Sequence, residues 1–205
     1  MMAVTAMTLP PPPVSRKEIL RYAGAGGDTT LDTLLDECLA EALPQLSYRV
    51  AYAVFPIQRT PKALDFGFMQ SESSGLGKCL SGFDHVLVFG ATVGHAYDRL
   101  LTKSAALSPL RALIFDAIGA ERAESLCDAF CADMAASYQR MGGILGPRYS
   151  PGYGDLPLSV QRDLFRVMDF SKHIGLTLNE SLLMTPRKSV TAFVGVRYDG
   201  AISKN

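Results

Sequence analysis

The amino-acid sequence predicts an α+β fold, and three observations favour that class. The chain has 205 residues, 48% hydrophobic and 20% charged, so it is long enough to bury a sizeable core. Strand-like segments are mixed with single and paired helices along the chain. No internal repeat or interdomain linker divides it. We therefore expect one domain over residues 14–205, preceded by a flexible, disordered Pro-rich tail at residues 1–13.

The first third of the chain predicts two helices and two strands. Ser15 and Glu18 have the spacing of a capping box, so a helix begins there. Apolar residues at helical spacing predict a second helix over residues 31–42. Alternating β-forming residues predict strands over residues 47–55 and 64–69.

The middle of the chain predicts one buried strand among helices. A short helix is expected at residues 74–81. Val86–Phe89 is a continuous apolar run, which is typical of a strand buried on both faces. A helix follows and ends before Pro109. Two further helices are expected, one starting at Pro109 and another running through residues 126–138.

Residues 142–159 predict a long loop that is stiffened by three prolines and rich in glycine. Connections of this length inside a compact domain are usually functional. The loop carries Arg148 and Tyr153, a planar cation and an aromatic face, which together indicate a binding surface. A helix capped by Ser159 and ending at Gly175 should follow, and then strands at residues 182–184 and 189–197.

Composition and motifs argue against several classes of protein. Twenty acidic and twenty basic residues cancel and form no charged run, so nucleic-acid binding has no electrostatic basis. The apolar runs are too short to cross a membrane. With no signal-like start and only four cysteines, a reduced cytoplasmic location is expected. Gly75-Leu76-Gly77-Lys78 lacks the first glycine and the Ser or Thr of a phosphate loop. The three histidines have no metal-ligand spacing, so no metal site is predicted.

A resemblance to a known family rests on several spaced motifs. Arg148-Tyr149-Ser150-Pro151-Gly152-Tyr153 is followed by a helix, by Gly175-Leu176-Thr177-Leu178-Asn179-Glu180-Ser181, and by the turn Met184-Thr185-Pro186. This order resembles the activation domain of cobalamin-dependent methionine synthase over roughly residues 120–196. The whole chain is more similar to the short, stand-alone relatives of that domain.

The resemblance implies both an architecture and a function. The architecture would be an antiparallel sheet flanked by helices. The function would be that of a methyltransferase-type reactivation protein in methionine biosynthesis. It would bind S-adenosylmethionine (AdoMet) and support reductive remethylation of cobalamin on a separate methionine synthase or corrinoid protein, with a flavodoxin-like reductant supplying the electron. The partner would carry the cobalamin, since Asp84 and His85 are adjacent here and do not form the Asp-x-His-x-x-Gly motif of corrinoid carriers.

The same resemblance implies six site residues. The catalytic residue would be Tyr153, near the transferred methyl group, and the cofactor-binding residues would be Arg148, Ser150, Gly152, Asp128 and Glu180. Arg148 would hold the methionine carboxylate, since a guanidinium binds a carboxylate bidentately. The backbone at Ser150 would read adenine, and Asp128 would accept from the amino group of AdoMet.

A second class of function stays open. The family has an early aspartate in a Trp-rich segment, whereas this chain contains no tryptophan. The family's terminal part is shortened here to Arg197-Tyr198-Asp199-Gly200. A non-catalytic module that docks on a corrinoid protein without binding AdoMet fits these departures. In that case Arg148 would tie loop carbonyls together, and Tyr153 would only pack the loop.

Overall fold

A five-stranded antiparallel sheet forms the centre of the protein. The computed structural model describes residues 3–26 and 29–198. The strand order is β1-β2-β6-β10-β7, and every neighbouring pair is antiparallel. The strands are β1 (Thr5–Thr8), β2 (Arg49–Pro56), β6 (His85–Thr92), β7 (Gly143–Tyr149) and β10 (Ser189–Tyr198). The α+β class and the antiparallel architecture are therefore confirmed.

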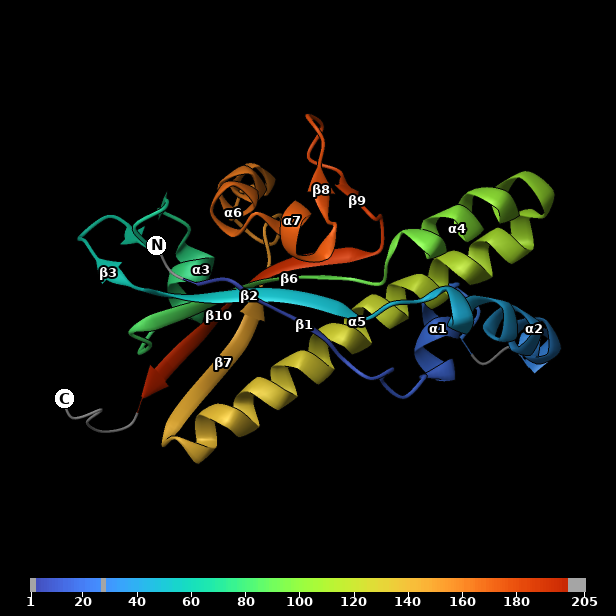
Figure 1. Ribbon diagram of the computed structural model, residues 1–205, viewed down its shortest axis with the longest axis horizontal. Helices are drawn as coiled ribbons and strands as arrows, with labels where there is room; N and C mark the ends of the chain where they lie inside the picture. Colours follow the sequence, from blue (N-terminus) through green and yellow to red (C-terminus); the bar gives the residue numbers. More distant parts are fainter. Residues whose placement is uncertain (1–2, 27–28, 199–205) are drawn as a thin grey trace.

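Helices cover both faces of this sheet (Figure 1). One face packs against α1 (Arg16–Tyr22), α2 (Asp32–Ala42), α4 (His95–Leu107) and α5 (Pro109–Arg140). The other face packs against α3 (Ser74–Cys79), α6 (Gln161–Met168) and α7 (Phe170–Ile174). Each face thus has its own apolar core. Strand β6 lies between β2 and β10 and is buried from Val86 onward, as its continuous apolar run predicted.

The remaining elements are short. Three one-turn 3₁₀ helices are η1 (Thr29–Leu31), η2 (Leu43–Gln45) and η3 (Leu158–Val160). A small sheet contains β3 (Gln58–Arg59), β4 (Leu64–Asp65) and β5 (Gln70–Ser71), and a two-stranded ribbon pairs β8 (Thr177–Leu178) with β9 (Met184–Thr185). The strand predicted at residues 64–69 is thus only two residues long, because Asp65 accepts from the Gly67 N–H and turns the chain.

Residues 3–13 do not form a disordered tail, contrary to the prediction for residues 1–13, of which residues 1–2 lie outside the described residues. Thr5–Thr8 pairs with β2 as an edge strand of the main sheet. The prolines lack N–H groups, yet their carbonyl oxygens still accept hydrogen bonds. Arg122 of α5 donates to the Pro12 oxygen at 2.7 Å and to the Pro13 oxygen at 2.6 Å. The segment is extended, as predicted, but it is held against the domain.

Two helix predictions were wrong about where helices break. Residues 109–140 form one continuous helix where two were expected. Gly119 lies within this helix and does not interrupt it. A Cβ atom at this position would come within 2.5 Å of Tyr97, so the glycine allows α5 to pack closely against α4. Conversely, the helix expected after Ser159 is two helices. Asp169 adopts a left-handed conformation between them, with φ 42°, and Ser159 caps neither.

The predicted loop over residues 142–159 is half strand. Residues 143–149 form β7, which pairs with β10 at the edge of the sheet. Pro147 hid this strand from the sequence pattern, although an edge strand tolerates a residue that lacks an N–H. The irregular segment is only residues 150–157. It therefore starts from a fixed strand end and not from a flexible connection.

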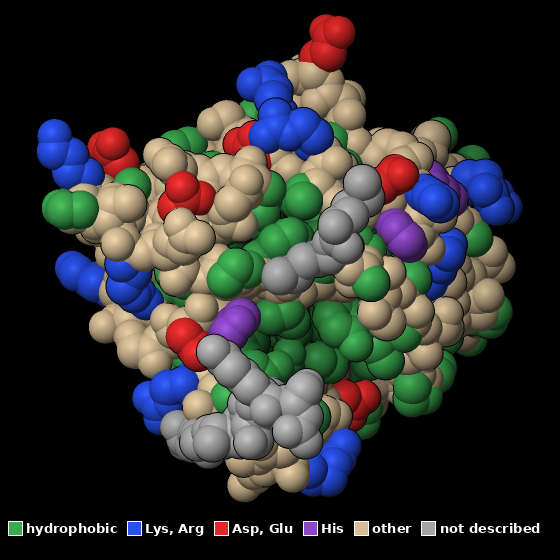
Figure 2. Space-filling model, turned by 60° about the vertical axis from the view of Figure 1, so that its left-hand side comes forward, with side chains coloured by type: hydrophobic (Ala, Val, Ile, Leu, Met, Phe, Trp, Pro, Cys, Tyr) green, Lys and Arg blue, Asp and Glu red, His purple; other side chains and the backbone are tan. Residues whose placement is uncertain are grey.

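The surface carries both signs of charge. On the face shown in Figure 2, cationic and anionic side chains are interspersed around a hollow lined with hydrophobic side chains. Among the described residues, no helix has the length and apolar character needed to cross a membrane.

We predict that Arg122→Met destabilises the protein by about 3–5 kcal/mol, because it leaves the Glu121 carboxylate buried without its partner. The Arg122 side chain is fully buried, and its Nε lies 2.5 Å from Glu121 Oε2. Glu121 also accepts from the Ser15 N–H at 3.0 Å, so the pair ties the start of α1 to α5. Urea unfolding measures the free energy of unfolding.

Arg21→Met is the matched control, since Arg21 forms an exposed ion pair with Glu18. This substitution should destabilise the protein far less, because solvent-exposed ion pairs contribute little to stability. Equal effects of the two variants would contradict a special role for the buried pair.

Candidate functional site

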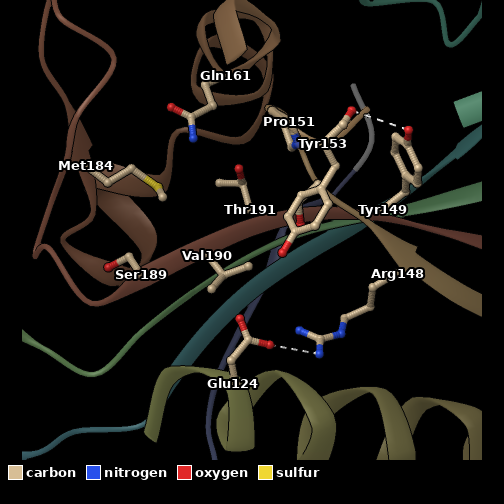
Figure 3. A pocket seen from close by; sticks show the side chains of 11 residues that line it. Glu124, Arg148, Tyr149, Pro151, Tyr153, Gln161, Met184, Ser189, Val190 and Thr191 are labelled. Atoms are coloured by element: carbon tan, nitrogen blue, oxygen red, sulfur yellow. Dashed lines mark hydrogen bonds and ion pairs between the residues drawn. The ribbon is translucent and has the colours of Figure 1, made fainter. Parts of the chain in front are cut away.

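A cavity of about 520 Å³ opens where β7 ends. Its volume lies in the range of small-molecule sites. Figure 3 shows its lining, which comes from α5, β7, the 150–157 loop, α6, β9 and β10. The lining residues are Glu124, Arg148, Tyr149, Ser150, Pro151, Tyr153, Gln161, Met184, Ser189, Val190 and Thr191.

The open edge of β10 forms one wall of this cavity. Strand β7 pairs with β10 from Tyr198 back to Phe193, where Tyr149 is the last partner. Residues 189–192 of β10 continue beyond that point and pair only with β6. Backbone groups along an unpaired strand edge can bind another molecule. The cavity exists because the chain leaves the sheet at Ser150-Pro151 while β10 continues.

Arg148 supplies the cation of the cavity. It lies on β7 opposite Val194, one residue before the strand ends. Its Nη2 donates to Asp128 Oδ1 at 2.7 Å and to Glu124 Oε2 at 3.1 Å, both from α5. Burial by itself lowers the pKa of Arg148, but the negative groups beside it outweigh that effect and raise the pKa. In the described part of the chain both ion pairs use Nη2, so Nε and Nη1 can still meet a ligand.

Residues 150–157 are held in one conformation by their own hydrogen bonds and by α3. The Gly152 N–H donates to the Leu156 oxygen at 2.9 Å, and Gly152 has φ 90°, which favours glycine. Leu156 is buried in the core beneath α6. The Asp155 carboxylate accepts from Ser73 Oγ at 2.5 Å and from the Ser74 N–H at 2.6 Å. The Ser73 hydrogen bond, together with those from the α3 backbone, holds the pKa of Asp155 well below its usual range.

The two tyrosines of the motif have different positions. Tyr149 donates its hydroxyl hydrogen bond to the Tyr153 backbone oxygen at 3.3 Å and helps to fix the turn. The Tyr153 side chain is 68% exposed and hangs over the cavity from the loop (Figure 3). Its ring is therefore accessible both to a ligand and to a partner protein.

Two buried polar side chains in the lining each have an oxygen without a hydrogen-bond partner among the described residues. Gln161 is 4% exposed and Thr191 is 2% exposed. Gln161 Oε1 and Thr191 Oγ1 make no hydrogen bond in the structure. Buried polar atoms are almost always paired, so these two oxygens are available to hydrogen-bond a polar group or a water molecule in the cavity.

The structure brings together only part of the predicted site. Arg148, Ser150 and Tyr153 line the cavity. Gly152 shapes the loop without lining the cavity. Asp128 contacts Arg148, but its side chain is 71% exposed and outside the lining. Glu180 is also exposed and outside the lining, and its backbone oxygen accepts from Arg162 at 3.2 Å.

The carboxylate that the sequence reading missed is Glu124. It lies one helical turn before Asp128 on the same face of α5, where residues four apart are neighbours. That spacing could have revealed it. Gln161 and Thr191 had no comparable signal, because they come from α6 and β10 and meet only in the folded chain.

Comparisons with known proteins identify the family and the fold. The family model described as "Vitamin B12 dependent methionine synthase, activation domain" matches residues 83–200, more than half of the chain. The chain therefore belongs to that family, as its motifs indicated. No curated protein matches it.

One solved structure among the matches is the MetH reactivation domain bound to AdoHcy (S-adenosylhomocysteine). Its TM-score is 0.64 at 17% sequence identity, and the alignment covers 98% of this chain and 81% of that one. At this identity the likeness establishes a shared fold.

We predict that Asp155→Asn lowers the melting temperature at pH 7, because the amide cannot replace the charge-assisted bonds to the start of α3. The depressed pKa means that the carboxylate stabilises the folded state above its ordinary pKa of 3.8. This stabilisation is lost progressively as the pH falls below that value. The difference in melting temperature between wild type and variant should thus be constant from about pH 5 to 8 and become smaller below about pH 3.8.

Scanning calorimetry across that pH range measures the difference in melting temperature. Asp163→Asn is the control, since Asp163 forms an ion pair with the exposed Arg166 on its own helix. A difference in melting temperature that does not change with pH would contradict a stabilising role for the Asp155 carboxylate at the start of α3.

Proposed function

We propose that this protein binds AdoMet in the cavity and supports reductive remethylation of cobalamin carried by a separate methionine synthase or corrinoid protein. Family membership and the neighbour solved with AdoHcy support this choice of ligand. The observation that carries it is the cavity itself, which has one cation–anion pair at one side and buried, unpaired polar atoms at the other.

The charges of the cavity fit a zwitterion. Among the lining residues, Arg148 is the cation and Glu124 is the anion. A methionine-like group carries one carboxylate and one ammonium, so it can meet both. A nucleotide phosphate would find only one cation, already paired with two carboxylates. The lining therefore favours a nucleoside that bears an amino acid over a nucleotide.

Three residues have the chemistry to hold the amino-acid half of AdoMet. Arg148 would bind the carboxylate, because a guanidinium forms strong charge-assisted hydrogen bonds to it. Glu124 would accept from the ammonium, in place of the Asp128 expected from the sequence. The Tyr153 ring would lie near the sulfonium, since an aromatic face attracts a cation. When bound, AdoMet supplies the methyl group and leaves as AdoHcy.

The loop would hold the other half. Ser150 and Pro151 line the cavity, and Gly152 lets the backbone turn beside it. This arrangement supports a role for the Ser150 backbone in reading adenine. Because the loop is fixed by Asp155 and Leu156, little ordering would be needed on binding.

The remaining components of the reaction would come from other proteins. Cobalamin would be carried by the partner, and a flavodoxin-like reductant would supply the electron that cob(II)alamin needs before it accepts a methyl group. A cytoplasmic location fits this scheme. The exposed ring of Tyr153 at the mouth of the cavity suits an approach by that partner.

Arg148→Ala should weaken AdoMet binding by about 2 kcal/mol, roughly 30-fold in Kd, because a charge-assisted contact to the carboxylate is lost. Isothermal titration calorimetry of AdoMet into both proteins measures this. Arg140→Ala is the matched control, since Arg140 lies at the end of α5, outside the cavity lining, and donates to Ser137 Oγ.

No binding heat in the wild type, with and without a corrinoid protein, would exclude AdoMet binding. It would leave the alternative of a docking module that acts without AdoMet.

Tyr153→Phe should lower the rate of cobalamin remethylation at least fivefold in the presence of a corrinoid protein, while AdoMet affinity changes less than twofold. The ring, which would bind the sulfonium, is kept, and only the hydroxyl near the methyl group is removed. The visible absorbance of cobalamin reports the rate, and calorimetry reports the affinity. Equal losses in both quantities would place Tyr153 in binding alone.

A further inference from the structure

Gln161 and Thr191 form a separate part of the cavity, on the side opposite its charges. Figure 3 shows Arg148 and Glu124 at one side, while Gln161, Met184 and Thr191 surround the other. The two groups belong to opposite faces of the sheet. Arg148 and Glu124 lie on the side of the sheet that α5 covers. Thr191 lies on the same strand face as Phe193, which packs in the core beneath α6 and α7 on the other side.

This part of the cavity carries no charge. Its polar groups are the carboxamide of Gln161 and the hydroxyls of Thr191 and Ser189. Ser189 Oγ donates its one hydrogen to the Pro186 oxygen at 2.7 Å and accepts from the Thr92 hydroxyl at 2.8 Å, so its donor is already used. Gln161 and Thr191 are the members with unpaired buried atoms. A charged group placed here would be buried without a counter-ion, so a neutral group with hydrogen-bonding atoms fits best.

Met184 adds an apolar contact to this subsite. Its half-buried side chain lines the same cavity as Gln161 and Ser189, and its sulfur points toward the cavity (Figure 3). A thioether makes favourable contacts with aromatic rings. A ligand group that is neutral, ring-shaped and edged with hydrogen-bonding atoms therefore matches all three residues.

We propose that Gln161 and Thr191, with Met184, bind the nucleoside end of the ligand and so determine the direction in which the ligand lies. This inference rests on the proposed AdoMet binding and goes beyond it. It assigns two specificity-determining residues outside the Arg148–Tyr153 motif. The amino-acid end lies at Arg148 and Glu124, and the nucleoside end lies between α6 and the open edge of β10.

The free protein provides a first test. Thr191→Val replaces a buried, unpaired hydroxyl with a methyl group of the same shape, which removes a desolvation penalty. The melting temperature of the unliganded variant should rise by about 2–4 °C. Thr5→Val, on the exposed strand β1, is the control and should not change it.

Binding of two probes tests the assignment. AdoHcy has both ends, and 5′-methylthioadenosine has the nucleoside end without the amino acid. Thr191→Val and Gln161→Leu should each weaken both probes by about tenfold, a loss of about 1.4 kcal/mol by the standard conversion. Arg148→Ala should weaken AdoHcy and leave methylthioadenosine within twofold of the wild type. Calorimetry at one temperature gives all the affinities.

Thr191→Ser separates the hydroxyl from packing, because it keeps the hydroxyl and loses the methyl group. It should bind AdoHcy within about threefold of the wild type. A loss equal to that of the valine variant would overturn the assignment.

The other outcomes are also distinct. If AdoHcy binds the wild type and both Thr191→Val and Gln161→Leu equally well, the nucleoside lies elsewhere, although the proposed function stands. The same conclusion follows if AdoHcy binds and methylthioadenosine does not. If AdoHcy fails to bind the wild type at all, the proposed function fails and the subsite assignment fails with it.

Discussion

Strand β7 ends opposite Phe193, four residues short of the start of its antiparallel partner β10, and the site depends on this difference in strand length. Tyr149 is the last residue of β7 to pair, opposite Phe193, while β10 extends back to Ser189. Pro151 cannot donate to a strand ladder, so the chain turns away at this point. The unpaired edge of β10 then faces the cavity, whose other walls include the 150–157 loop, α6 and α5. The position of the cavity is therefore set by the residue at which β7 ends.

A second constraint is electrostatic. Arg148 is half-buried, and a guanidinium in that position needs a counter-charge. Glu124 and Asp128 provide it from adjacent turns of α5, which also fixes the side chain before any ligand arrives. Because only Nη2 is used among the described contacts, the same arginine can hold a carboxylate without first breaking both ion pairs. The cavity is thus preorganised and close to neutral overall.

Local sequence patterns predicted the elements whose signals are themselves local. The Ser15 cap, the buried run of β6 and the Gly175 helix end agree with the structure. The failures have long-range causes. Gly119 stays helical because it packs on Tyr97, and residues 143–149 form a strand because β10 offers an edge. The proline-rich start is ordered because Arg122, more than a hundred residues away, binds its carbonyl oxygens.

The site was predictable to a similar extent. A single contiguous motif contains Arg148, Ser150 and Tyr153, so the sequence could group them, and the structure places all three in the lining of one cavity. Glu124 could have been identified from the sequence, because it lies four residues before Asp128 on a predicted helix. Gln161 and Thr191 could not be found in advance, because nothing in the sequence relates the start of α6 to the start of β10. Their lack of partners is visible only in the folded protein.

The most direct test of AdoMet binding is a crystal structure grown with saturating AdoHcy. We expect the nucleoside in the cavity, with its carboxylate at Arg148 and its ring between Gln161 and Thr191. An empty cavity under those conditions, with Arg148 still bound only to Glu124 and Asp128, would contradict AdoMet binding at this site.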